Sequence, residues 1–153
     1  MRISSMMALV LVLVACDPGQ PNDVVGINVE SLSVHVAYSP LCPGERILSV
    51  SVYLVHGNVV GDSDDRVLWR AESPSGTRTR DFVVGEAGTG LNQTVPLAEP
   101  LAGARELAAQ IETTLFPDPT TVFTLDGLRS DQVLTGDGFL GLEEFRGKAP
   151  SSC

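Results

Sequence analysis

Apolar and polar residues alternate along most of this chain, in short segments that glycine and proline clusters separate, as at 73–76, where we expect a turn. The segments lie at 32–38, 48–54, 67–71, 82–84, 91–97 and 122–125. A period of two that is rich in β-branched residues is typical of strands with one buried face. On the first segment the apolar side consists of Leu32, Val34, Val36 and Tyr38. We expect 91–97 to be an edge strand, because Pro96 has no N–H to donate to a neighbour.

The segment 107–115 fits either a strand or a helix. Its apolar residues occupy every second position, as in a strand, but Leu107, Ile111 and Leu115 also stand four residues apart, as on one face of a helix. The neighbouring segments have strand patterns, and Pro117 follows closely. We therefore predict a strand and keep the helix as the alternative.

These patterns predict an all-β fold: an immunoglobulin-like antiparallel β-sandwich of about seven strands that spans residues 24–153. The chain shows no alternation of strands with long helices, so a parallel sheet is not expected. Residues 142–146 have a helical composition and should form a short C-terminal helical turn. Since Cys153 is the last residue, Trp69 should not pack against a disulfide between core strands, as it would in a true immunoglobulin domain.

The N-terminal segment has the features of an export signal. Arg2 precedes a run of uncharged, mostly apolar residues at 6–15. A helix of this run would be roughly 15 Å long, half of the hydrocarbon core of a bilayer, and therefore too short for a permanent membrane span. A positive start followed by a short apolar run is typical of secretory signals.

Residues 13–16, Leu-Val-Ala-Cys, resemble the lipobox of bacterial lipoproteins. In that family the signal is cut before the cysteine, and the cysteine sulfur is diacylated. The resemblance implies a signal peptide at 1–15, lipidation at Cys16, a polar tether at 16–23, and a place on the extracytoplasmic face of the cell membrane. Membrane lipid would then be a partner through the acyl anchor. The alternative is an ordinary cleaved signal in which Cys16 is incidental.

Charge and composition exclude several classes of function. Ten Lys and Arg against 19 Asp and Glu give a formal net charge of −9, whereas a nucleic-acid partner requires basic surface to replace the counterions of its phosphates. Two histidines, and three cysteines without CxxC spacing, predict neither a metal site nor a cofactor.

If Cys16 carries lipid, Cys42 and Cys153 remain in an oxidising compartment. We expect a disulfide between them, which would hold the last residue of the chain against the domain; the alternative is two free thiols. The tail after Phe145 has little apolar surface, so it has no other reason to become ordered.

The stretch Asp137–Phe145 resembles the second half of an EF-hand calcium loop, with Gly138 at the sixth position. The first and third positions are then Val133 and Thr135, which supply no carboxylate. We therefore expect a glycine turn before a short helix, with Phe145 packed on the sandwich.

Gly61-Asp-Ser63 is similar to the nucleophile block of GDS-type esterases. Those enzymes also need an aspartate and a histidine near the C-terminus, but no histidine follows His56. Because a serine without a base is unreactive at neutral pH, no catalytic residues are predicted and we do not expect an enzyme.

Two charged clusters are further candidates. The loop Asp62–Asp65 is either a cation site or a solvated loop. Arg78 and Arg80 either bind an anion or pair with Asp81 or Glu86. His35 and His56 are expected to face solvent.

The chain as a whole resembles small actinobacterial envelope lipoproteins, through Cys-Pro-Gly-Glu-Arg at 42–46, Glu144-Phe145 and a terminal cysteine. That resemblance implies a location but no activity. We expect a membrane-anchored, non-enzymatic module that binds or scaffolds an envelope protein. The alternatives are an envelope hydrolase with an unrecognised site and a lipoprotein that binds a small ligand or cation.

Overall fold

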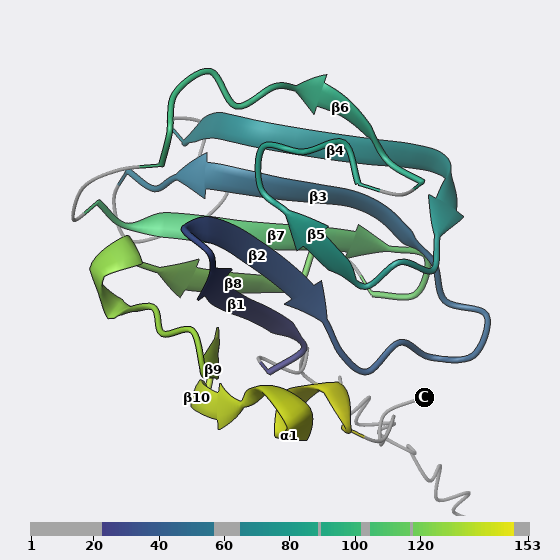
Figure 1. Cartoon of the computed structure of the whole chain (residues 1–153). Helices are drawn as coiled ribbons and strands as arrows, with labels where there is room; N and C mark the ends of the chain where they lie inside the picture. The colour runs from purple at the N-terminus through teal and green to yellow at the C-terminus, as the bar shows by residue number, and fades with distance from the viewer. Residues whose placement is uncertain (1–22, 57–64, 89, 102–104, 117, 149–153) are drawn as a thin grey trace, which may run out of the picture.

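Two five-stranded antiparallel sheets form a sandwich-like all-β fold in the computed structural model (Figure 1). The structure describes residues 23–56, 65–88, 90–101, 105–116 and 118–148. The first sheet contains, in spatial order, β10 (Gly138–Gly141), β9 (Gln132–Thr135), β1 (Val25–Glu30), β2 (Ser33–Tyr38) and β5 (Asp81–Val83). The second contains β6 (Asn92–Val95), β4 (Arg66–Thr77), β3 (Ile47–Leu54), β7 (Leu107–Thr113) and β8 (Thr120–Phe123).

The core lies between the two sheets and consists of the apolar side of the alternating segments. Its fully buried members include Ile27, Val36, Val50, Val52, Trp69 and Ile111. Trp69 stands opposite Val52 in the pairing of β4 with β3. The period-two prediction is therefore confirmed in these strands, because alternate side chains point to opposite faces of a sheet.

The predicted number of strands was too low, since the described residues form ten. The pattern missed β1, where Gly26 and the buried Asn28 interrupt the alternation, and also the four-residue strands β9 and β10. The pattern also placed the start of the next strand at residue 32, one residue before β2 begins. The partners Glu30 and Ser33 leave only Ser31 and Leu32 for the hairpin turn, so Leu32 lies outside β2 and is fully exposed.

The expected turn at 73–76 is also wrong, because this segment lies within β4. Pairing with β3 holds on both sides of it, at Glu72 with Ser49 and at Thr77 with Ile47, so the four residues form a bulge. Gly76 has φ +70°, and an added Cβ would stand 2.6 Å from the Cβ of Arg46. The glycine therefore marks a close approach of two strands and not a chain reversal.

Three further predictions are confirmed. The ambiguous segment is the strand β7, which pairs with β3 on one side and β8 on the other. The strand β6 lies at the edge of its sheet. The C-terminal helical turn is α1 (Leu142–Arg146), and a short 3₁₀ turn, Leu125–Gly127, follows β8.

The helix α1 covers the outer face of the first sheet. Phe145 is 1% exposed and packs with Ala37 of β2 and Val133 of β9 in a second, smaller apolar cluster. Gly26 lies beneath it, and a Cβ at this position would come within 2.7 Å of the ring of Phe145 and closer still to Val133. The aromatic ring fits on the sheet because β1 has no side chain there.

The sandwich has two ends that differ in character. At the root end (Asp23, Lys148), the Lys148 ammonium donates to the Asp23 carbonyl oxygen at 3.0 Å and pairs with the Asp23 carboxylate. The far end (Leu32, Leu54, Leu107) holds the β1–β2 hairpin, the end of β3 and the start of β7 (Figure 1). Of the tether expected at 16–23, residues 16–22 lie outside the described residues, and Asp23 lies at the root end.

Candidate functional site

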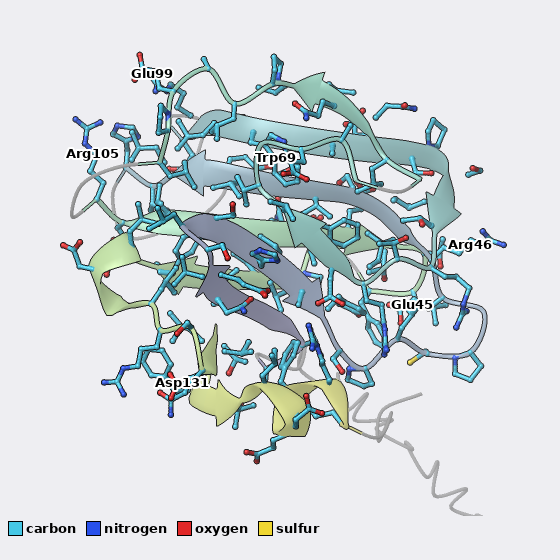
Figure 2. All side chains as sticks on the ribbon, in the orientation of Figure 1. Glu45, Arg46, Trp69, Glu99, Arg105 and Asp131 are labelled. Atoms are coloured by element: carbon cyan, nitrogen blue, oxygen red, sulfur yellow. The ribbon has the colours of Figure 1, made fainter. Side chains whose placement is uncertain are left out.

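A pocket opens at the far end, beside the segment that leads from β6 to β7. Its volume is about 350 Å³, at the lower limit for sites that hold small organic ligands. Five apolar residues line it: Leu54, Leu68, Pro100, Leu101 and Leu107. Three charged residues complete the lining: Arg66, Glu99 and Arg105. Glu99 and Arg105 stand at this end in Figure 2, whereas Glu45 and Arg46 lie toward the opposite end.

Two smaller hollows extend this surface. One of about 220 Å³ lies between the start of β4 and residues 95–99. The other, of about 170 Å³, lies between the β1–β2 hairpin and residues Leu97, Pro100 and Leu101. All three hollows include residues of the segment 95–101, which makes the far end a continuous surface of mixed apolar and polar character.

The two arginine side chains of the pocket have no ionic partner among the described residues. The side chains of Arg66 and Arg105 form no ion pair or hydrogen bond with another residue in the described part of the chain. Both are exposed at the rim of the pocket. In a chain of net charge −9, two arginines and one glutamate create a local positive spot above an apolar floor.

Leu32 gives the same end an exposed apolar anchor. It is 100% exposed, and its backbone φ is +71°, next to Ser31 with φ +50°. A two-residue hairpin turn with both φ values positive is normally made by Asn-Gly, since other side chains are strained there. Leu32 thus combines a strained backbone conformation with full exposure of an apolar side chain at this end.

The chemistry that the pocket offers is limited to a few groups. It contains one carboxylate, Glu99, and none of the eight described lining residues is Ser, Cys, Thr or His. The described lining therefore supplies no nucleophile with an adjacent base, and its charged side chains are two arginines and one glutamate.

The root end holds a buried carboxylate, which the sequence pattern did not predict. It belongs to Glu45, within the 42–46 stretch, and is 0% exposed. Its Oε1 accepts the Tyr38 hydroxyl at 2.8 Å, and its Oε2 accepts the Cys42 backbone N–H at 2.8 Å. Burial, followed by the hydrogen bond and the charge of Glu45, raises the pKa of Tyr38 well above its usual range. This cluster fixes the shape of the loop between β2 and β3.

Cys42 is disulfide-bonded and 2% exposed. Its partner lies outside the described residues, as do both Cys16 and Cys153. The pairing of Cys42 with Cys153 and the lipidation of Cys16 therefore stay predictions.

The structure brings together only some of the charged residues that the sequence singled out. Asp81 is not paired with Arg78 or Arg80; its described ionic partner is Arg146, at 3.7 Å. Arg78 instead donates to the backbone carbonyl of Glu45 at 3.4 Å. The ion pair forms because α1 holds Arg146 close to β5, although the two residues are far apart in sequence.

The loop 62–65 is described only at Asp65, whose carboxylate accepts the backbone N–H of His56 at 2.8 Å. His56 is exposed, as expected, whereas His35 is half-buried on the outer face of the first sheet. The esterase-like Ser63 lies outside the described residues.

The EF-hand-like stretch begins in the turn between β9 and β10 and continues through β10 into α1, so a strand separates the predicted glycine turn from the helix. Gly138, the first residue of β10, has φ +119°, and Phe145 is buried, as predicted. In the described part of the chain, no group of three His, Cys, Asp or Glu side chains is placed to hold a metal ion.

Comparisons with known proteins give no relative for this chain: no protein-family model, curated protein or solved structure matches it. No helix among the described residues has the length and apolar character needed to cross a membrane.

The far-end site could not be found by scanning the sequence for motifs. Its residues come from β3, β4, β7 and the 95–101 segment, and no two of the three charged members are neighbours in the chain. The one local signal was the serine-leucine pair at 31–32, in a position where the chain reverses.

Proposed function

We propose that this protein is a lipid-anchored, non-enzymatic binding module of the bacterial envelope, held to the extracytoplasmic face of the membrane through Cys16. Its binding surface is the far end of the sandwich. The lipobox at 13–16 supports the anchor, because two or more acyl chains on one cysteine make a durable membrane attachment.

The observation that carries the proposal is the position of the pocket relative to the root end. The tether would join the domain at Asp23, where Lys148 pairs with it, while Leu32 and the unpaired Arg66 and Arg105 lie at the opposite end. An anchored domain of this shape presents its apolar far end away from the point of attachment. The acidic body supports this orientation, since an anionic membrane surface repels it.

We also infer an immunoglobulin-like connectivity for the sandwich. The strands β1, β2 and β5 are adjacent in one sheet, and β4, β3, β7 and β8 are adjacent in the other. This order matches strands A, B and E opposite C′, C, F and G of such domains, with β6, β9 and β10 as additions at the edges. Exposed loops carried by such a rigid scaffold commonly hold binding residues.

Photo-crosslinking in intact envelopes tests the proposed surface. A photoreactive amino acid at Leu101 should give defined adducts, whereas the same group at Arg80, an exposed residue toward the root end, should not. Equal adducts from both positions, or none from Leu101, would contradict a binding surface at the far end.

The anchor is tested separately with the full chain. Cys16→Ala should abolish acyl labelling and release the protein from the membrane fraction, with Cys153→Ala as the control that keeps the label. Persistent acylation of the Cys16→Ala variant would overturn the lipoprotein assignment.

A further inference from the structure

We propose that the far-end pocket binds a single carboxylate carried on a short, unbranched apolar chain. This inference rests on the proposed function, because it specifies the ligand of the same surface.

The size and floor of the pocket set the apolar part of the ligand. A volume of about 350 Å³ admits a slim chain but not a large ring system. Leu54 and Leu107, the buried members of the lining, close the bottom of the pocket, and the half-buried Leu68 and Leu101 form walls. The five apolar side chains of the lining offer no hydrogen-bond partners, so methylene groups laid against them lose less than polar groups would.

The charges at the rim of the pocket determine the polar group of the ligand. Arg66 and Arg105 supply two positive charges and Glu99 one negative charge, a balance that matches one negative charge on the ligand. Inorganic phosphate lacks an apolar chain and would leave the apolar part of the lining uncovered. A guanidinium also matches a carboxylate in shape, because its parallel N–H groups bind both oxygens at once.

Neither arginine must give up an existing ion pair with a described residue in order to bind this ligand. The cost of binding is then mainly the loss of side-chain freedom at an exposed rim. A free fatty acid carries this chemistry, whereas the carboxyl terminus of an apolar peptide adds branched side chains and backbone amides and is the competing ligand in the test.

Isothermal titration calorimetry on the full chain in phosphatidylcholine nanodiscs tests the inference, with empty nanodiscs as the blank. Octanoate should bind with a Kd of about 1 mM or tighter. Octanamide has the same shape without the charge and should bind about tenfold more weakly, as should inorganic phosphate. Trileucine and its C-terminal amide form the second pair: trileucine should bind more weakly than octanoate, whereas tighter binding would identify a peptide terminus as the ligand and contradict an unbranched apolar chain.

The double variant Arg66→Gln with Arg105→Gln should weaken octanoate binding about tenfold. The matched control, Arg80→Gln with Arg146→Gln, removes the same charge from exposed residues toward the root end and should leave binding unchanged. Circular dichroism of both variants checks that the strand signal is retained.

Equal binding of octanoate and octanamide, no binding of either carboxylate, or equal effects of the two double variants would overturn the inference. Any of these results combined with intact crosslinking at Leu101 would refute the carboxylate ligand alone. Loss of the crosslink as well would refute the binding surface itself.

Discussion

At the scale of single residues, the most informative feature is a leucine where the backbone favours Asn or Gly. Leu32 gains nothing from burial, because it is 100% exposed, and its positive φ costs free energy. Residues kept at such a cost are commonly functional, and their replacement improves stability at the expense of function.

We therefore predict that Leu32→Asn raises the free energy of unfolding by about 1 kcal/mol, since Asn adopts a positive φ with less strain. Urea unfolding measures the change. The control is Leu115→Asn, at another exposed leucine (55%) that does not have a positive φ; this substitution should be nearly neutral. A loss of stability in Leu32→Asn would show that the leucine packs against part of the chain and does not await a partner.

The Tyr38–Glu45 pair predicts sensitivity to alkaline pH. Burial and Glu45 raise the pKa of the folded Tyr38, whereas an unfolded tyrosine has a pKa of about 10. The folded chain thus keeps a proton that the unfolded chain loses. The stabilisation from this group is complete below about pH 10 and is lost as the pH rises from there through the raised pKa.

Urea unfolding between about pH 9 and about pH 11.5 checks this prediction. The decline in the free energy of unfolding should be smaller in Tyr38→Phe, which lacks the titrating group; Tyr53→Phe should decline like the wild type. Parallel declines in wild type and Tyr38→Phe would assign the effect to other groups.

At the scale of elements, α1 depends on the absence of a side chain on β1. Gly26 leaves the space that Phe145 and Val133 fill. The helix has five residues, too few to be stable alone, so packing of Phe145 on the sheet is what maintains it.

Gly26→Ala should therefore lower the free energy of unfolding by about 2 kcal/mol, the usual cost of one extra carbon in a packed site. Thermal and urea unfolding measure it. Gly141→Ala is the matched control, because its added Cβ would have its nearest neighbour at an ordinary 3.9 Å. If Gly26→Ala were neutral, α1 would have to move away from the sheet without loss, and its role in covering that face would be refuted.

At the scale of the whole molecule, the cysteine pairing and the lipid anchor are linked. Cys42 is disulfide-bonded, and the chain has only two other cysteines, Cys16 and Cys153. One sulfur cannot carry both a diacylglycerol and a disulfide, so a lipidated Cys16 requires Cys153 as the partner.

Non-reducing peptide mapping of the exported protein should yield one linked pair that contains Cys42 and Cys153. Reduction should then destabilise the domain by roughly 4 kcal/mol, because the bond closes a loop of about a hundred residues. A Cys42–Cys16 peptide would contradict both the expected pairing and the anchor.

The sequence by itself determined that the chain forms sheets, and which residues of several strands face inward. Val34 and Val36 on one strand, and Val50 and Val52 on another, are buried as their pattern predicts. This is possible because successive side chains of any strand point to opposite faces, a local property of the backbone. The short helix at 142–146 was equally readable, since it depends on a few adjacent residues.

Only the tertiary structure decided which segments meet. Pairing of Glu30 with Ser33 turned Leu32 from an expected core residue into an exposed one, and α1 brought Arg146 to Asp81. The far-end pocket arises in the same way, where four separate segments converge. Strand pairing joins residues that are distant in sequence, and its register depends on the whole set of strands, so no local pattern carries this information.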